Sequence, residues 1–315
     1  YGGPLFNSWL DRELELAGRI VTRDSAENLV RTGPLLRIPQ LAIHLDRGVN
    51  DGLVLDKQRH LQPVWGVGDG AQADLLALLA ERAGIDAADI AGYDLLTADT
   101  ASPARFGLDD ALFASGRLDN LSSVHAGLRA LLQAPEDAGH ISVLAAFDHE
   151  ELGSESRSGA SGPLLEDVLA RVGGALGASV DDRLRAFAAS WCVSADAGHA
   201  VHPNYPERHD PVNRPVAGGG PLLKINANQR YATDALGAAL WARSCAAAGV
   251  AFQEFVSNNA IPCGSTIGPL TATRLGIRTV DVGVPLLSMH SARELMHVDD
   301  AVALSAAVDA FFAGA

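Results

Sequence analysis

The sequence contains little cysteine, few aromatic residues and no long apolar run. Its three cysteines, Cys192, Cys245 and Cys263, show no paired spacing, which favours a reducing compartment over a disulfide framework. No apolar stretch is long enough to span a bilayer, and no secretion signal is recognisable. We therefore expect a cytoplasmic protein. Aromatic residues make up 5% of the chain, so Ala, Leu and Val must fill most of the core.

Positive charge is scarce relative to negative charge. Lys and Arg total 24 against 38 Asp and Glu, which gives a formal net charge of −14. We therefore expect neither nucleic acid nor anionic membranes as partners. Acidic substrates stay compatible, because a local cation or bound metal ions can reverse the field inside a pocket. A hydrophobic content of 48% is enough for a sizeable core in one large or two smaller domains.

The pattern of elements changes along the chain. Up to about residue 95, short apolar pieces alternate with Gly, Pro, Asn and Asp turn residues, and a helix is predicted over 71–82. From about residue 96, strands and helices alternate, which predicts an α/β fold with a mixed, mostly parallel sheet flanked by helices. Strands are predicted over 90–98, 140–147, 190–195, 221–226, 251–257 and 277–283, and helices over 119–133, 161–175, 180–189, 231–248, 266–275 and 298–313.

An acidic pair, Glu150-Glu151, follows the apolar run from Ile141 to Phe147. The run predicts a buried strand, and open α/β sheets place their chemistry at the carboxyl ends of strands. Successive side chains of an extended segment point opposite ways, so one glutamate could hold a metal ion while the other faces a water. Taken alone, a solvated acidic turn is the simpler interpretation, because carboxylates are mostly exposed.

Three further positions could complete a metal site. Asp119 precedes a helical pattern, Asp196 follows an apolar strand, and His290 lies beyond the predicted strand 277–283. Each also has a simpler role, as a helix N-cap, a turn residue and a hydrogen-bonded histidine respectively. Together they form an oxygen and nitrogen ligand set that suits zinc, manganese or cobalt. A carboxylate shared by two such ions could help to activate a water for hydrolysis.

Several long segments, in the same order, resemble the aspartyl aminopeptidases, the dinuclear-metal family that includes vacuolar aminopeptidase I. They are Tyr1-Gly2-Gly3 with Trp9-Leu10-Asp11-Arg12, the segments around Asp119 and Glu150-Glu151, Asp196 to Tyr205, Cys263 to Pro269, and Leu287-Ser288-Met289-His290-Ser291. The resemblance runs from Tyr1 to near the C-terminus. It implies a zinc-exopeptidase-like catalytic domain over residues 96–315 and an inserted, β-rich dimerisation domain over residues 1–95.

The resemblance also implies a role for each residue of the metal site. Asp119 would bridge two divalent metal ions, most simply zinc. Glu151 and His290 would bind one of the ions, and Asp196 would bind the other. Glu150 would be the general base that takes a proton from the bridging water.

Three residues would contact the peptide substrate by the same resemblance. His199 would lie near the scissile carbonyl, and Lys224 would help to bind the substrate. His44 would reach into the active site of a neighbouring subunit. In this family dimers build a dodecamer, so the resemblance implies a homo-oligomer of that kind.

The function implied is a metal-dependent aminopeptidase that removes N-terminal residues, preferentially Asp or Glu. The family has another metal-binding histidine in a segment that would precede Tyr1, so we expect the chain to lack an N-terminal portion of the catalytic domain. One alternative is a catalytically incomplete assembly module. Another is a related dinuclear deacylase, although the segment from Asp196 to Tyr205 resembles the aminopeptidases specifically.

Overall fold

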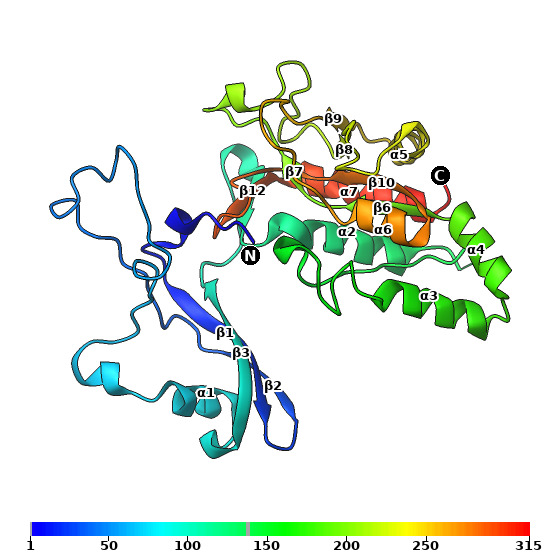
Figure 1. Cartoon of the computed structure of the whole chain (residues 1–315). Coiled ribbons are helices and arrows are strands. Elements are labelled where there is room, and N and C mark those ends of the chain that lie inside the picture. Colours follow the sequence, from blue (N-terminus) through cyan, green and yellow to red (C-terminus); the bar gives the residue numbers. More distant parts are fainter. Residues whose placement is uncertain (1, 137–138) are drawn as a thin grey trace. The chain divides into compact units, whose positions relative to one another are not determined.

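The computed structural model describes residues 2–136 and 139–315, so Tyr1 of the Tyr1-Gly2-Gly3 segment lies outside the described residues. The chain divides into two compact units. The larger unit contains Ala104–His290 and Glu294–Ala315 together with the first residues of the chain, and the smaller unit contains Pro4–Pro103 and Ser291–Arg293. Figure 1 labels the helices and strands of both units.

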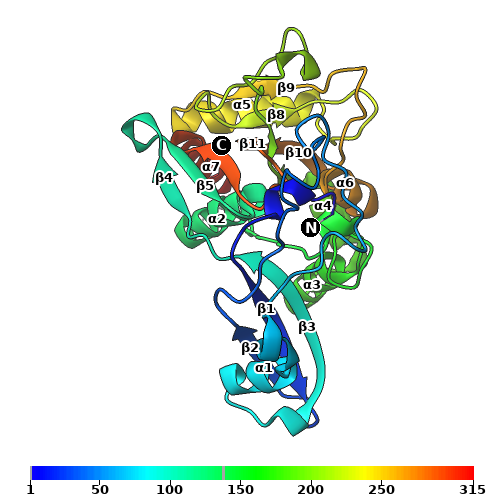
Figure 2. The same cartoon turned by 90° about the vertical axis from the view of Figure 1, so that its left-hand side faces the viewer.

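The smaller unit is built on an antiparallel sheet with the strand order β2-β1-β3. One helix, α1, packs against it (Figure 2), and the buried side chains of Ile20, Val30 and Leu79 form the shared core. Helix α1 begins where the Asp74 carboxylate accepts the amides of two following residues, and it ends at Gly84, whose φ is 70°. The elements are η1 Phe6–Trp9, β1 Leu14–Thr22, β2 Glu27–Arg31, η2 Gly68–Gln72, α1 Leu75–Ala83, η3 Ala87–Asp89 and β3 Ile90–Asp99.

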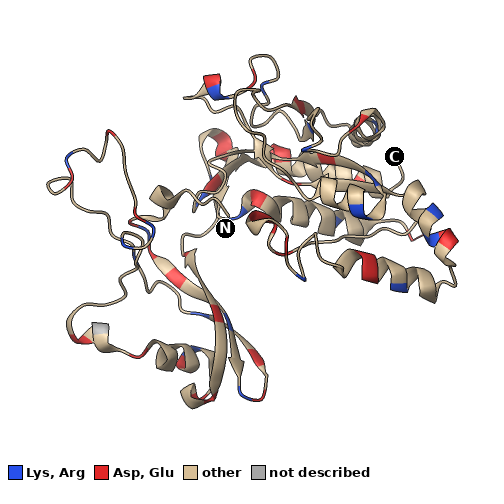
Figure 3. Ribbon diagram, in the orientation of Figure 1, with Lys and Arg blue, Asp and Glu red and all other residues tan. Residues whose placement is uncertain are grey.

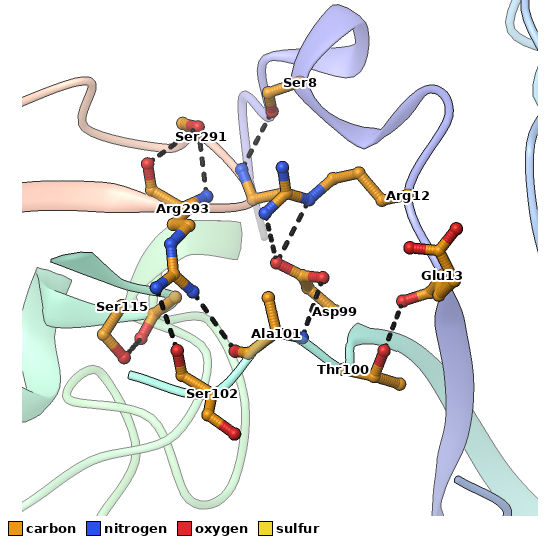
Figure 4. Close-up of polar contacts among 12 residues, drawn as sticks. Ser8, Arg12, Glu13, Asp99, Thr100, Ala101, Ser102, Ser115, Ser291 and Arg293 are labelled. Atoms are coloured by element: carbon orange, nitrogen blue, oxygen red, sulfur yellow. Dashed lines mark hydrogen bonds and ion pairs between the residues drawn. The ribbon is translucent and has the colours of Figure 1, made fainter. Parts of the chain in front are cut away.

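A three-residue segment from near the end of the chain also belongs to the smaller unit (Figure 4). The guanidinium of Arg293 donates to the carbonyls of Ala101 and Ser102, at 3.2 and 2.8 Å. The amide of Ala292 donates to the hydroxyl of Ser8 at 2.8 Å. These bonds attach the segment to residues about two hundred or more positions earlier in the chain.

The larger unit contains two mixed sheets. The four-stranded sheet has the order β6-β10-β8-β9, and the five-stranded sheet has the order β4-β5-β12-β11-β7. The pairs β6–β10, β8–β9 and β7–β11 are parallel and the other pairs are antiparallel. The strands are β4 Ala104–Phe106, β5 Leu112–Ser115, β6 Trp191–Ala195, β7 Gly198–His199, β8 Leu222–Lys224, β9 Gln253–Phe255, β10 Arg278–Gly283, β11 Pro285–Leu287 and β12 Glu294–His297.

Helices flank these sheets, as the sequence predicts (Figure 1). The core between sheet and helices includes the fully buried Trp241 on α5, Val280 on β10 and Leu304 on α7. The helical elements are η4 Leu108–Asp110, α2 Leu118–Gln133, η5 Glu150–Leu152, α3 Leu164–Ala175, α4 Val180–Ala189, η6 Pro206–Arg208, α5 Ala235–Ala248, α6 Gly268–Leu275 and α7 Val298–Phe312. The predicted α/β class, with mixed sheets flanked by helices, is therefore confirmed, but the described sheets of this unit are not mostly parallel, because three of their seven strand pairs are parallel.

The buried strand predicted over residues 140–147 is wrong. Residues 140–147 form no strand, and Ile141 and Val143 are 62% and 43% exposed. An apolar run becomes a strand only when neighbouring backbone completes its hydrogen bonds. Within the part of the chain that the structure describes, no strand pairs with this segment. The acidic pair therefore follows a segment that pairs with no described strand.

Residues of both charge signs occur along α3 and α4 (Figure 3). On α4, Ser179 and Asp182 form a reciprocal cap at the N-terminus, and Arg185 pairs with Asp182 at 2.6 Å. Such local pairs satisfy the first turn of the helix without help from tertiary contacts.

Among the described helices, none is both long and apolar enough to cross a membrane.

Candidate metal centre

Four segments of the larger unit supply the candidate metal ligands. Asp119 lies in the first turn of α2, and Glu151 lies in η5, the short helix that follows the unpaired segment. Asp196 comes directly after β6, and His290 lies in the turn between β11 and β12. These positions are far apart in sequence, so only the folded chain can bring the four side chains together.

Three of these residues form a compact cluster. The Nε2 atom of His290 lies 3.1 Å from a carboxylate oxygen of Glu151 and 3.4 Å from one of Asp119. One potential ligand atom from each residue lies within 4.8 Å of the other two. Asp119 is only 6% exposed, and the other two side chains are half-buried. Two carboxylates and an imidazole at this spacing fit a zinc-like divalent cation.

Asp196 joins the cluster through Asp119. The carboxyl groups of Asp196 and Asp119 are in hydrogen-bonding contact, and Asp119 also lies 3.4 Å from Nε2 of His290. The ammonium group of Lys224 donates to Asp196 at 3.0 Å and to the carbonyl of Ala197 at 2.6 Å. Lys224 is 2% exposed, so its charge is balanced inside the protein by Asp196.

The protonation of Glu150 reflects this concentration of carboxylates. Burial raises the pKa of Glu150 to about 7, and the negative charges of Asp196, Glu151 and Asp119 add to the rise while Lys224 opposes it. A carboxyl group with a pKa near neutrality can both accept and return a proton at physiological pH. The position of Glu150 is therefore suited to proton transfer beside the cluster.

The pKa of His290 is also raised, which for an imidazole favours the charged form. Its hydrogen-bonded contacts with Asp119 and Glu151 raise the pKa of His290 to about 10. In the metal-free chain a protonated imidazole therefore offsets part of the negative charge. A metal ligand must be the neutral imidazole, so a divalent cation at this position competes with that proton.

Aromatic rings pack near Lys224. The ring of His199, on β7, lies 6.2 Å from the ring of Phe255, which in turn lies 6.2 Å from the ring of Tyr231. The ammonium group of Lys224 lies 5.4 Å from the centre of the Tyr231 ring. Partial burial lowers the pKa of His199 to about 4, and the nearby Lys224 charge adds to the effect. The His199 ring is therefore neutral at physiological pH.

His44 lies in the smaller unit, in an exposed turn of the long irregular segment between β2 and α1. Its role at the site of a neighbouring subunit stays a prediction.

Sequence reasoning gave no role to Glu294. This residue on β12 is fully buried, and its two carboxylate oxygens accept the backbone amides of Asp119 and His290, at 2.9 and 2.7 Å. Burial raises the pKa of Glu294 to about 7. The only sequence signal is a glutamate four positions after His290 and next to Arg293, which is too weak to reveal the contact.

A mixed α/β unit that gathers carboxylates and one histidine at the ends of its elements is typical of the zinc exopeptidases. Residues 1–312 match the model of the aminopeptidase I zinc metalloproteases (M18). The chain belongs to this M18 family.

Curated relatives carry the same family name. The chain is 58% identical over 320 residues to the probable M18 family aminopeptidase 2 of Streptomyces avermitilis, a match that covers 100% of this chain and 74% of the relative. It is 46% identical over 322 residues to the protein of that name from Mycobacterium tuberculosis H37Rv, with 99% and 74% covered. The chain thus spans about three quarters of the length of these relatives.

Solved structures share the fold. A chain in the cryo-EM structure of the Ape4 and Nbr1 complex matches with a TM-score of 0.94 and 35% identity, over 99% of this chain and 65% of that one. The crystal structure of prApe1 matches with a TM-score of 0.89 and 29% identity, covering 99% and 71%. The S. cerevisiae mApe1 dodecamer matches with a TM-score of 0.80 and 29% identity, again covering 99% and 71%.

Proposed function

We propose that this protein is an aminopeptidase that removes N-terminal residues from peptides, preferentially Asp and Glu, in the cytoplasm. Family membership supports the reaction class, and the position of Asp119 is the observation that supports the mechanism. Its carboxyl group contacts both His290 and Asp196. A carboxylate in that position can be shared by two metal ions.

The proposed site holds two divalent ions, zinc by family and manganese or cobalt by ligand chemistry. Asp119, Glu151 and His290 would hold one ion, and Asp119 and Asp196 would hold the other. When bound, such ions polarise the scissile carbonyl and make water acidic enough to be deprotonated near neutral pH. The buried carboxylates of the chain fix where that chemistry takes place.

Glu150 is the proposed proton carrier. It would accept a proton from the attacking water and then give that proton to the amine of the departing peptide. The water oxygen forms the new bond to the carbonyl carbon as the C–N bond breaks. The raised pKa of Glu150 supports both halves of this role, because the group can be ionised before the attack and protonated after it.

Lys224 and His199 are the proposed substrate contacts. Lys224 uses two of its three N–H donors on Asp196 and Ala197, which leaves one donor for a substrate carboxylate. A neutral His199 can donate a hydrogen bond to a carbonyl oxygen without adding charge. An acidic N-terminal side chain would be favoured because its carboxylate could accept a charge-assisted hydrogen bond from the remaining Lys224 donor.

The direct test is the variant Glu150→Gln. We expect metal content to stay at the wild-type level, while turnover of an aspartyl substrate falls by roughly 10²–10⁴-fold, the usual contribution of a positioned acid or base. Glu155→Gln is the matched control, because Glu155 is an exposed glutamate on the same loop. Near-normal turnover in Glu150→Gln, with Glu155→Gln also normal, would show that another group is the base.

A further inference from the structure

Glu294 makes a pair of backbone contacts within the site. Among the described residues, no other residue of the site makes the same pair. One of its oxygens accepts the amide of Asp119 at 2.9 Å, and the other accepts the amide of His290 at 2.7 Å. The two donating amides belong to the metal-ligand candidates on α2 and in the turn before β12. A single side chain therefore joins the backbones of two ligands that lie 171 positions apart in the sequence (290 − 119).

The two ligands need such support because regular structure does not fix their backbones. His290 has a φ of 65°, in the left-handed region, and Ser288 in the same turn has a φ of 56°. Asp119 has φ −80° and ψ 107°, outside the helical region, although it lies in the first turn of α2. Non-glycine residues with positive φ persist only when their surroundings hold them in place.

We propose that Glu294 is a positioning residue that sets the separation and orientation of Asp119 and His290 and thereby the affinity of the site for a divalent ion. The inference rests on the metal site of the proposed function. Partners that orient metal ligands commonly act through the ligand side chains. Here the contact is made to the ligand backbones, so it fixes where each side chain begins.

The chemistry of the contact requires a carboxylate. Both donors are backbone N–H groups, and an ionised carboxylate presents only acceptors. A glutamine at this position would present one acceptor and an NH₂ group, so one amide would face a donor instead of an acceptor. An aspartate would keep the charge but is one methylene shorter, so it could not reach both amides at once.

The larger unit contains a close control for this idea. Asp300 on α7 is also fully buried, and its two oxygens accept the backbone amides of Gly218 and Gly220, at 2.7 and 2.8 Å. It matches Glu294 in burial, charge and number of amides held. It differs because neither glycine is a metal-ligand candidate.

The experiment measures Co²⁺ binding by absorption titration in the wild type, Glu294→Gln and Asp300→Asn, with circular dichroism to verify the fold. We expect roughly 10–100-fold weaker binding in Glu294→Gln, the usual cost of losing an orienting partner. Asp300→Asn should bind Co²⁺ about as tightly as the wild type. Glu294→Asp should also bind weakly, and it tests the same point if the glutamine variant does not fold.

Wild-type affinity in Glu294→Gln, or an equal loss in Asp300→Asn, would overturn the inference. Hydrogen exchange of the wild type gives an answer that needs no variant. The amides of Asp119 and His290 should exchange slowly without metal, and rapid exchange of both would also overturn it. A wild type that binds no Co²⁺ would instead remove the metal site of the proposed function, and this inference with it.

Discussion

At the scale of single residues, Lys224 shows most clearly how burial changes an interpretation. Its sequence context allows an exposed lysine at a strand edge, but the folded chain buries it and pairs it with Asp196. The ammonium therefore touches a candidate metal ligand, and substrate binding is the second task proposed for it. The effect of replacing Lys224 on acidic and on neutral substrates would show which of the two tasks dominates.

We expect Lys224→Ala to lower kcat/KM for Asp and Glu substrates. The loss should correspond to about 2–5 kcal/mol of transition-state free energy, the size expected for breaking a desolvated charge pair. Leu substrates should lose less, because they offer no carboxylate to the ammonium. The comparison needs kcat/KM for all three substrates, with Arg171→Ala on the exposed surface of α3 as the control. Equal losses would mean that Lys224 holds Asp196 rather than selecting the substrate.

A second residue-scale prediction concerns Asp300. Burial raises the pKa of Asp300 to about 6, against an ordinary value of 3.8, although the amides of Gly218 and Gly220 oppose the rise. The folded state therefore binds this proton more readily than the unfolded state. The contribution of Asp300 to the free energy of unfolding therefore grows as the pH falls from about 7 to 4. This contribution is lost as the pH rises through 6.

This contribution is measurable as a difference between two proteins. Between pH 7 and pH 4, the unfolding free energy of the wild type should gain up to about 3 kcal/mol relative to Asp300→Asn, since each pKa unit is worth about 1.4 kcal/mol. Urea denaturation at both pH values provides the measurement. A difference that does not change with pH would mean that Asp300 titrates normally.

Candidate residues could be recognised from the sequence more readily than their contacts. Carboxylates beside turns and strand ends suggested Asp119, Glu151 and Asp196, because residue type and local position are visible in a sequence. The contact of Glu294 with two distant amides and the burial of Lys224 depend on how β12 and β8 lie in their sheets. No local spacing encodes such placements.

At the scale of elements, predictions succeeded where the signal is local. The helices follow apolar periodicity and end at glycines such as Gly84, Gly249 and Gly276, which adopt positive φ. The strands of two to four residues in the five-stranded sheet were not predicted. Strands this short form only where a neighbouring strand completes their hydrogen bonds. The failed strand over 140–147 has the same cause, since apolar composition does not supply a hydrogen-bonding partner.

The packing of α1 on its sheet gives an element-scale prediction. Leu79 is fully buried against Ile20 and Val30, whereas Leu76 on the same helix is 36% exposed. Leu79→Ala should destabilise the smaller unit by about 2–5 kcal/mol, because the cavity adds to the lost burial. Leu76→Ala should cost distinctly less. Urea unfolding of both variants tests this, and similar losses would contradict the packing described here.

At the scale of the whole molecule, the order of motifs was the strongest signal. Long matching segments from one end of the chain to the other predicted the family, which the match over residues 1–312 confirms. Assembly is harder to infer, because it depends on surfaces that a single chain does not pair. One solved relative is described as a dodecamer, and a comparable homo-oligomer built from dimers is our proposal for this protein.

The final prediction joins assembly to activity through His44. If His44 serves the site of a neighbouring subunit, light scattering should show a species much larger than a dimer, and His44→Gln should lower activity without changing that mass. Co-expression of His44→Gln subunits with Glu150→Gln subunits should then restore activity in about a quarter of the sites by random mixing, because a site needs each group from a different chain. His125→Gln, on the exposed face of α2, is the control for His44→Gln. A fully active monomer, or mixed assemblies no more active than their parents, would refute the shared site.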